Sequence, residues 1–421
     1  MYAFTKNADS SDSASLAVVD NAAGTQGVIY YRTSGGWATS KTNDTAGLRT
    51  RFATFVDYVF RVNGTDVVAT STDPPASSWG TTNAPGTITP KYVNVYEDRV
   101  YVLRGASAGQ KSRLWFSSLP SSGTSITWDI TNDFVDVNPD DGDEFTGVIN
   151  HGDVQLLFKN RALFRWRFKN VEPDRVIGVG APDQEAIAGH YELGITFFVN
   201  RHGAWAYTSG YPKNIGRKIQ PFFDAITDAN ISGIRTGIDS DHFYIYPGAD
   251  VTVDGRTYRN PVFVYTISLD AWTIDTLYDA PRYFGNYLSS NQEVLHFGNN
   301  NGGIFQLGGI TAMTDDSGGA AAPIAGEVEF KEEFLSVDGS FGRNLTVFAD
   351  NFVGLKWSYR YDRSPDWINA GEQKRRIHKL LMSQRGHYVQ LRAADNSSNR
   401  SIIEGYNIEH GEEETKRRTH A

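Results

Sequence analysis

The sequence repeats a short antiparallel unit before residue 309, and this repeat restricts the fold more than any other feature. In each unit an apolar strand runs into a polar turn and then into a strand rich in Tyr, Phe and Val. The strands after those turns share one pattern: VDYVFRV, EDRVYVL, HGDVQLLF, ELGITFFV and DSDHFYIY. Such alternation is typical of half-buried antiparallel strands that follow tight turns. Units of roughly 40 residues predict the four-stranded blades of a β-propeller.

We count seven such units, and six to eight blades are compatible with them because the N-terminal unit could complete the last blade. The units span residues 2–37, 51–79, 91–128, 145–168, 187–208, 231–272 and 283–308. A tryptophan lies at or near the end of most of them: Trp37, Trp79, Trp128, Trp166, Trp205 and Trp272. We expect these indoles to pack between neighbouring blades. The alternative is that one or two of them are exposed and form a platform for a sugar.

The pattern changes near residue 309, which divides the chain into four parts. Residues 1–309 are predicted to be the β-propeller, and the Gly- and Ala-rich residues 310–323 a linker. Residues 324–411 hold about six short strands with turn signals and predict a small β-sandwich. The charged residues 412–421 are predicted to be a disordered or partner-binding tail. Helical signals are confined to 219–230 and to 370–384, which also fits a loop followed by a strand.

Composition excludes several classes of chemistry. The 421 residues include no Cys, which rules out disulfides, thiolate catalysis and Cys-based zinc or iron–sulfur sites. We find no run of eighteen apolar residues and no signal-peptide pattern, so we expect neither a membrane span nor export by a signal of its own. The 15 basic and 15 acidic residues from Pro323 onward cancel, so the net charge of −9 lies entirely before it. An acidic body argues against tight binding to nucleic-acid phosphates.

One acidic segment, NPDDGDE at 138–144, is a weak candidate for a metal site. Its oxygen-bearing side chains alternate around a glycine, as in a calcium loop, and the candidate ligands are Asp140, Asp141 and Asp143. A calcium loop also needs a Glu at its twelfth position, where this chain has Ile149. The competing interpretation is a solvated turn between two strands, which Pro, Asp and Gly favour.

No other group of residues predicts a catalytic, cofactor or metal site. The carboxylates Asp239, Asp241, Asp250 and Asp254 are expected in turns, and the sequence does not place them as a hydrolase pair. The nine histidines form no metal-binding or catalytic spacing, and no nucleotide-binding glycine motif is present. A basic group in the predicted sandwich fits either a solvated face or a surface for DNA or an acidic partner. Its members are Lys374, Arg375, Arg376, Arg385, Arg392 and Arg400.

The order of these segments resembles a family of virion proteins. Four segments are similar to successive blades of the β-propeller tail-hub or nozzle proteins of short-tailed bacteriophages. They are the opening blade (2–37), FATFVDYVFRVNGT (52–65), RLWFSS with the stretch from ITWDITNDF to ALFRW (113–166), and residues 181–207. These are also called packaged-DNA stabilisation proteins. The segments LKWSYRYDRSPDW (355–367) and SIIEGYNIEHGEEETKRR (401–418) resemble the C-terminal sandwich of that family and its basic end.

The resemblance implies a non-enzymatic structural protein of the virion tail, made in the host cytoplasm and without a cofactor. Copies of the chain would form a ring that contacts the portal or adaptor and holds tail fibres or a needle. The genome would be retained by this ring and ejected through it without sequence-specific DNA binding. Two alternatives stay open: a propeller that binds or cleaves host glycans for adhesion, and a cellular interaction scaffold.

Overall fold

The computed structural model divides the chain into two compact, mostly β units. Unit 1 comprises Met1–Trp272 and Ala280–Leu307, and unit 2 comprises Thr273–Asp279 and Gly308–Ala421. The structure describes residues 2–5, 13–33, 36–74, 78–121, 125–168, 173–277, 279–289, 292–299, 303–307, 314–316, 321–323, 326–329, 333–334, 340–350, 355–362, 364–375, 377–381, 385–386, 388–395 and 402–411. Among these residues, no helix is long and apolar enough to cross a membrane.

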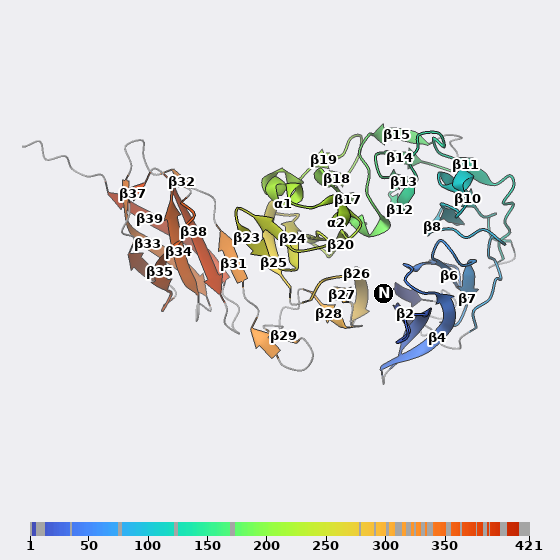
Figure 1. The fold of residues 1–421 in the computed structure, drawn as a ribbon, viewed down its shortest axis with the longest axis horizontal. Coiled ribbons are helices and arrows are strands. Elements are labelled where there is room, and N and C mark those ends of the chain that lie inside the picture. The colour runs from blue at the N-terminus through green and yellow to red at the C-terminus, as the bar shows by residue number, and fades with distance from the viewer. Residues whose placement is uncertain are drawn as a thin grey trace, which may run out of the picture. The chain divides into compact units, whose positions relative to one another are not determined.

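Among the described residues the propeller has seven sheets, all in unit 1 except that the last strand of blade 6 runs from unit 1 into unit 2 (Figure 1). In each sheet antiparallel strands follow one another along the chain, and in blade 6 a hairpin stands between the second and third strands. Blade 1 contains β1 (Tyr2–Thr5), β2 (Ser13–Asp20), β3 (Gln26–Thr33) and β4 (Gly36–Thr45). Blade 2 contains β5 (Arg51–Phe55), β6 (Tyr58–Val62) and β7 (Ala69–Ser71). Blade 3 contains β8 (Tyr92–Tyr96), β9 (Arg99–Leu103), β10 (Arg113–Phe116) and β11 (Phe134–Asp136). Blade 4 contains β12 (Phe145–His151), β13 (Val154–Lys159), β14 (Leu163–Trp166) and β15 (Asp174–Ile177). Blade 5 contains β16 (Ile187–His190), β17 (Ile195–Asn200), β18 (Gly203–Tyr207) and β19 (Lys213–Asn214). Blade 6 contains β20 (Arg235–Ile238), β21 (His242–Tyr246), β24 (Pro261–Thr266) and β25 (Ala271–Thr276). Blade 7 contains β26 (Tyr283–Ser289), β27 (Gln292–Gly298) and β28 (Ile304–Gln306).

The first strand of every blade is the innermost strand, and these seven strands close a ring. β1 contacts β5, and the contacts continue through β8, β12, β16, β20 and β26 back to β1. The N-terminal strands therefore form a blade of their own, and the ring closes by packing of β1 against β26. This arrangement is a seven-bladed β-propeller, in agreement with the seven repeat units of the sequence.

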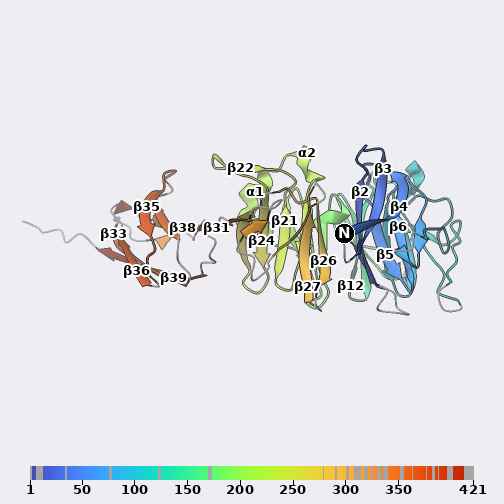
Figure 2. The same ribbon diagram turned by 90° about the horizontal axis from the view of Figure 1, so that it is seen from below.

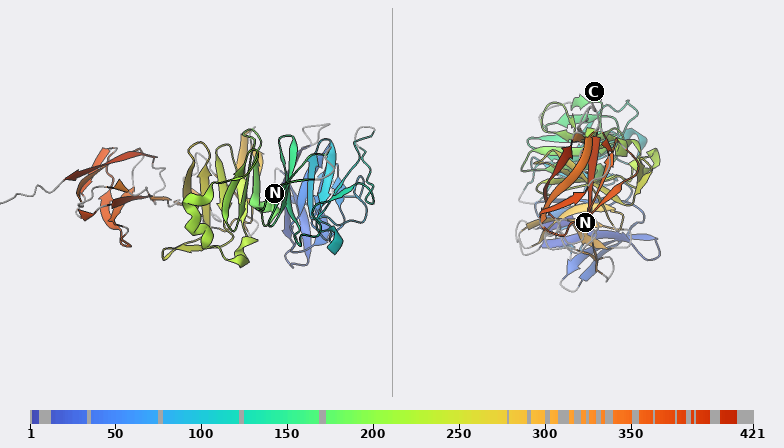
Figure 3. Two further views of the ribbon diagram at one scale, coloured as in Figure 1. Left: turned by 90° about the horizontal axis from the view of Figure 1, so that it is seen from above. Right: turned by 90° about the vertical axis from the view of Figure 1, so that its left-hand side faces the viewer.

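The two faces of the propeller differ in what they carry. Because the strands of a blade are consecutive and antiparallel, the turns after the first and third strands lie on one face, which we call the turn face. The links between blades and the turns after second strands lie on the opposite, connector face. That face carries α1 (Gln220–Asp224), α2 (Asp228–Ile231) and the hairpin β22 (Val251–Val253) and β23 (Arg256–Tyr258). Figure 2 shows these elements at one edge of the propeller, and they lie at its lower edge in the left view of Figure 3.

Aromatic side chains pack within and between the blades, as the repeat of tryptophans predicts. Trp166 is only 1% exposed, and its ring centroid lies 5.5 Å from that of Tyr101 in the preceding blade. Four of the other five indoles donate their N–H groups to protein oxygens. These bonds run from Trp79 to Ser40 (2.8 Å), from Trp128 to Asn83 O (2.7 Å), from Trp205 to Asn200 (3.2 Å) and from Trp272 to Ile215 O (3.0 Å). These four indoles are half-buried, and the hydrogen bonds leave no N–H group unpaired among them.

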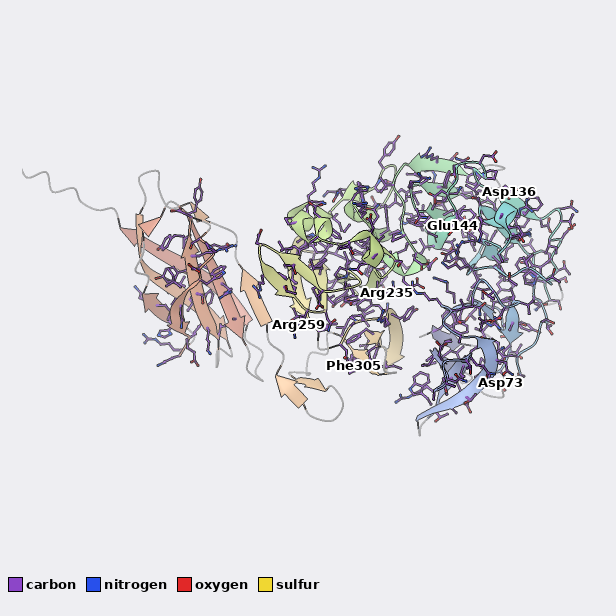
Figure 4. The ribbon with its side chains drawn as sticks, in the orientation of Figure 1. Asp73, Asp136, Glu144, Arg235, Arg259 and Phe305 are labelled. Carbon is purple, nitrogen blue, oxygen red and sulfur yellow. The ribbon has the colours of Figure 1, made fainter. Side chains whose placement is uncertain are left out.

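Polar contacts also join neighbouring blades near the inner strands. They are Tyr2 Oη to Thr54 Oγ1 (2.8 Å), Asn94 Nδ2 to Asn150 Oδ1 (2.7 Å), His151 Nδ1 to Thr196 Oγ1 (2.9 Å), His190 Nε2 to Ser240 O (3.0 Å) and Arg235 Nε to Arg282 O (2.8 Å). Arg235, the first residue of an innermost strand, lies near the propeller axis (Figure 4). Aromatic packing and inner hydrogen bonds together fix each blade against the next.

Unit 2 contains a β-sandwich of two antiparallel sheets. One sheet has the order β31 (Gly326–Glu329), β38 (Tyr388–Asp395), β34 (Lys356–Tyr361) and β35 (Ile368–Glu372), with β32 (Glu333–Phe334) also paired to β38. The other contains β36 (Ile377–Leu381), β33 (Ser340–Asp350), β37 (Arg385–Gly386) and β39 (Ile402–Gly411). Trp357 is fully buried between them, together with Tyr359 and Leu345. The alternation of buried and half-exposed residues along β34 explains why this segment forms a strand with one apolar face.

The segments that connect and follow the two units differ in part from their predicted form. The predicted linker contains a two-stranded hairpin, β29 (Thr314–Asp316) and β30 (Ala321–Pro323). Residues 219–230 do form helix, but as two short pieces, α1 and α2. Residues 370–384 take the alternative form, because the end of β35 leads through a loop into β36. The predicted tail, 412–421, lies outside the described residues.

Candidate functional site

A network of ion pairs crosses the propeller axis at the connector face. Arg49 lies in the link between blades 1 and 2, and Arg51 is the first residue of β5. Asp183 and Glu185 lie in the link between blades 4 and 5. Arg49 Nη1 lies 2.8 Å from Asp183 Oδ2 and 2.9 Å from Glu185 Oε2. Arg51 Nη2 lies 2.9 Å from Asp183 Oδ1 and 2.8 Å from Glu185 Oε1. We call these four residues the axial network.

Local structure holds the two carboxylates in place. Asp183 precedes the 3₁₀ helix η3 (Gln184–Ala186), and its side chain accepts a 2.8 Å hydrogen bond from the Gln184 backbone N–H. The Tyr92 hydroxyl donates to Asp183 as well, at 3.2 Å. The carbonyl of Glu185 accepts a 3.0 Å hydrogen bond from Thr236 Oγ1 in blade 6. Hydrogen bonds from its own link and from blade 3 thus orient the Asp183 carboxylate, and the backbone of Glu185 is fixed to blade 6.

The network is largely removed from water. The side chains of Arg51, Asp183 and Glu185 are 9%, 12% and 10% exposed. Burial opposes ionisation of Asp183, but the charges of Arg51, Lys91 and Arg49 outweigh it and hold the pKa of this carboxyl below its usual value. Burial, with Asp183 close by, raises the pKa of the Tyr92 hydroxyl well above its usual value. Asp183 is thus ionised at neutral pH, and Tyr92 is a neutral donor.

The position of the network decides what the propeller axis can do. In a ring of seven, blades 2 and 5 are three steps apart, which is the largest separation the ring allows. The ion pairs between them therefore bridge the axis, and Arg49 adds a 3.2 Å hydrogen bond to Ser232 O at blade 6. At the connector face these side chains occupy the space through which a polymer would have to pass.

The acidic segment 138–144 forms a link on the connector face that a buried lysine holds together. Lys159 Nζ lies 2.9 Å from Asn138 O and 2.9 and 2.8 Å from the two carboxylate oxygens of Asp141. The Lys159 side chain is fully buried. Its ammonium group therefore takes the place among these oxygens that a bound cation would need.

The remaining carboxylates of this segment have other orientations. Asp143 accepts hydrogen bonds from the backbone N–H groups of Glu144 and Arg161, both at 2.9 Å. Glu144 pairs with Arg104, and Asp140 is exposed. Within the described part of the chain, no group of three His, Cys, Asp or Glu side chains could hold a metal ion.

The other carboxylates singled out in the sequence lie in turns of blade 6. Asp239 accepts from the His242 backbone N–H (2.7 Å) and the Tyr244 hydroxyl (2.8 Å). Asp241 accepts from the backbone and side chain of Ser268, and Asp250 accepts from the Asn260 N–H. Asp254 has a φ of 50° in the turn of the β22–β23 hairpin. These hydrogen bonds stabilise turns, and they do not bring two carboxylates to opposite sides of a cleft.

The basic group predicted in the sandwich does not form one cluster among its described members. Lys374 and Arg375 lie exposed in the loop between β35 and β36. The Arg392 guanidinium lies 4.5 Å from the ring centre of Trp367, on the outward side of β38. Arg376 and Arg400 lie outside the described residues, and only the backbone of Arg385 is described.

Sequence reasoning missed the axial network. Arg51 and Asp183 are 132 residues apart, and neither belongs to a repeated pattern. The one available signal is the segment APDQEA before the fifth blade, where an Asp and a Glu stand two residues apart just ahead of an inner strand. Without the ring, nothing in that segment indicates its arginine partners.

The fold and its axial network define the chain as a seven-bladed β-propeller joined to a β-sandwich. No protein-family model matches the sequence, and no curated protein matches it. The chain is similar in structure to YCF48 from Cyanidioschyzon merolae, with 10% identity, a TM-score of 0.39, and coverage of 70% of this chain and 95% of that one. It is also similar to BamB from Moraxella catarrhalis (10% identity, TM-score 0.41, 71% and 86% covered) and to Sqt1 from Saccharomyces cerevisiae (8%, 0.40, 70% and 92%).

Proposed function

We propose that the chain is a structural protein of a phage tail, in which several copies form a ring that retains the genome and lets it leave. The observation that carries the proposal is that the charged groups of the propeller axis bind one another. The four charged side chains of the axial network are all used in ion pairs between distant blades. Such pairing suits a rigid structural subunit. The sequence resemblance to tail-hub and nozzle proteins supplies the particular role.

In this proposal, DNA passes through a lumen between copies of the chain, because the axial network crosses the axis of each propeller. The surface charge supports this arrangement. Turns on the turn face carry exposed acidic side chains in successive blades: Glu97 and Asp98, Asp153, and Glu192. An acidic wall repels the phosphate backbone, so that DNA slides past it without being held.

Electron microscopy of particles of the virus that encodes this chain tests the proposal. Antibody labelling should place the chain at the tail, and averaged images should show a ring of copies around a lumen. Absence of the chain from purified particles would refute the proposal. A ring with a strongly basic lumen would refute its electrostatic part alone.

A second candidate function, adhesion to host glycans, is favoured by two tyrosines on the turn face of blade 5. Tyr191 is 93% exposed and Tyr211 is 77% exposed, which is unusual for aromatic side chains. Exposed aromatic rings stack on sugar rings through their apolar faces. A glycan array should then show binding that Tyr191→Ala or Tyr211→Ala abolishes, and an array without any binding would leave only the structural role.

A further inference from the structure

A hollow on the connector face between blades 4 and 5 is lined by cationic side chains. Its volume is about 300 Å³, at the lower end of the range for small-ligand sites. Three turns or links and the end of α2 surround it. The lining residues of the β13–β14 turn, the link from β15 to β16 and the β17–β18 turn include Arg161, Gly178, Gly180, Asn200, Arg201 and His202.

The walls of this hollow are fixed by hydrogen bonds that do not use its cations. Asn200 Nδ2 donates to Gly180 O at 2.9 Å, and Asn200 Oδ1 accepts from the His202 backbone N–H at 2.8 Å. The backbone at Gly180 packs so closely that a Cβ there would lie 1.8 Å from Lys159 O. Only glycine fits this position, and the link is held against blade 4. The hollow is therefore preformed rather than assembled by a ligand.

Two arginines line the hollow, and each has an aspartate beside it. Arg161 is 73% exposed, and its Nε lies 3.9 Å from Asp143, beyond hydrogen-bond distance. Arg201 pairs with Asp228 at 2.8 Å, but these side chains are 61% and 73% exposed. An exposed pair of this kind contributes little and exchanges readily for another anion.

A third guanidinium lies at the edge. A Cβ on Gly178 would lie 3.6 Å from Arg175 Nη2, so this group borders the same link. The exposed His202 adds a fourth nitrogen-bearing side chain. A local gathering of three arginines stands out in the part of the chain before Pro323, which carries the whole net charge of −9. Arginine pairs with carboxylate and phosphate oxygens through two parallel N–H bonds, which favours oxyanions over neutral ligands.

We propose that this hollow binds a small oxyanionic ligand of monosaccharide size, held by Arg161 and Arg201. The shared chemistry is an anionic group with two or more oxygens, which a sugar phosphate or a sugar acid can supply. Binding belongs to the single chain and does not rest on the proposed ring.

Isothermal titration of the full chain tests this site with four probes: glucose 6-phosphate, glucuronate, inorganic phosphate and glucose. We expect saturable one-to-one binding of at least one anionic sugar and none of glucose. A response to glucose 6-phosphate and phosphate identifies the phosphate group, whereas a response to glucuronate identifies the carboxylate. Arg161→Gln and Arg201→Gln should each weaken binding about tenfold or more, since each removes one charge-assisted contact.

The matched control is Arg167→Gln. Arg167 pairs with Asp153 at 2.5 Å, its side chain is 53% exposed, and it follows β14 at the turn face. This variant loses the same charge from the same kind of exposed pair, so its affinity should equal that of the wild type. Far-UV circular dichroism establishes that all three variants are folded. No binding up to about 10 mM, equal binding of glucose, or equal weakening by Arg167→Gln would overturn the proposal.

Discussion

Replacement of Arg51 by Met tests whether the axial network holds the ring of blades together. Methionine keeps much of the apolar stem, but it removes one of the two guanidiniums that neutralise Asp183 and Glu185. Breaking a buried ion pair from one side destabilises by about 3–5 kcal/mol, because the other charge is left uncompensated. Arg49 still contacts both carboxylates in the variant. We therefore expect the low end of that range, about 3 kcal/mol.

This free energy converts to a measurable change in melting temperature. An unfolding entropy of roughly 2.1 cal/mol/K per residue gives about 0.6 kcal/mol per degree for a propeller of roughly 300 residues. Arg51→Met should thus lower the propeller's Tm by about 5 °C at pH 7 in differential scanning calorimetry. Arg113→Met is the control, because Arg113 makes two 2.7 Å bonds to Asp136, but at the outer strands of one blade (Figure 4). It should lower Tm by no more than about 2 °C, the effect of a pair worth about 1 kcal/mol.

The pH dependence provides a second measurement of the same interaction. The folded-state pKa of Asp183 lies below its unfolded value, so the stability it contributes is present above about pH 4 and is lost as the pH falls through the folded pKa. Arg51→Met moves that pKa towards the unfolded value, so the variant loses less stability than the wild type when the pH falls. The Tm difference between wild type and variant should therefore narrow below about pH 4. Equal shifts for Arg51→Met and Arg113→Met, or a difference that does not change with pH, would refute the reasoning.

Three further predictions concern packing and the acidic segment. Trp166→Ala should destabilise the propeller by about 3–5 kcal/mol, and Trp357→Ala should destabilise the sandwich by a similar amount, because both indoles are at most 1% exposed. In calorimetry, Trp166→Ala should lower the melting temperature of the propeller alone, and Trp357→Ala that of the sandwich alone. Lys159→Met should lower the propeller's free energy of unfolding by about 1–3 kcal/mol in urea, because it leaves Asp141 and the Asn138 carbonyl without their shared donor. An unchanged urea midpoint would mean that water replaces the ammonium group without a loss of stability. Gly180→Ala should destabilise by at least about 1–3 kcal/mol in the same assay, since its Cβ would lie 1.8 Å from a carbonyl oxygen, and a neutral result would mean that the link between blades 4 and 5 yields easily.

The blades could be predicted from the sequence because each is built from local contacts. Neighbouring strands such as β8 and β9 pair across a two-residue turn, so their alternation and the polar residues between them are visible in one short window. The tryptophans are predicted to pack between blades: Trp166 does so against Tyr101, whereas Trp205 bonds to Asn200 of its own blade. The sequence also restricted the net negative charge to the residues before Pro323.

The structure of the acidic segment 138–144 could not be predicted from the sequence. Spacing alone allows both a metal loop and a turn for Asp140, Asp141 and Asp143, because both need oxygens around a glycine. The deciding group, the Lys159 ammonium, comes from the next blade and has no fixed spacing from the segment. Its position depends on how β13 packs behind the link, which is a tertiary property.

The sequence by itself determined that this chain forms repeated antiparallel blades followed by a small sandwich, because strand alternation and turn residues act over a few positions. Only the tertiary structure decided that seven blades close on one another, that Arg49 and Arg51 meet Asp183 and Glu185 across the axis, and that cationic side chains of blades 4 and 5 line one hollow. These contacts join residues from separate blades, and charge pairing between them has no period along the chain. Ring closure brings them within bonding distance, and the ring exists only once all the blades have packed.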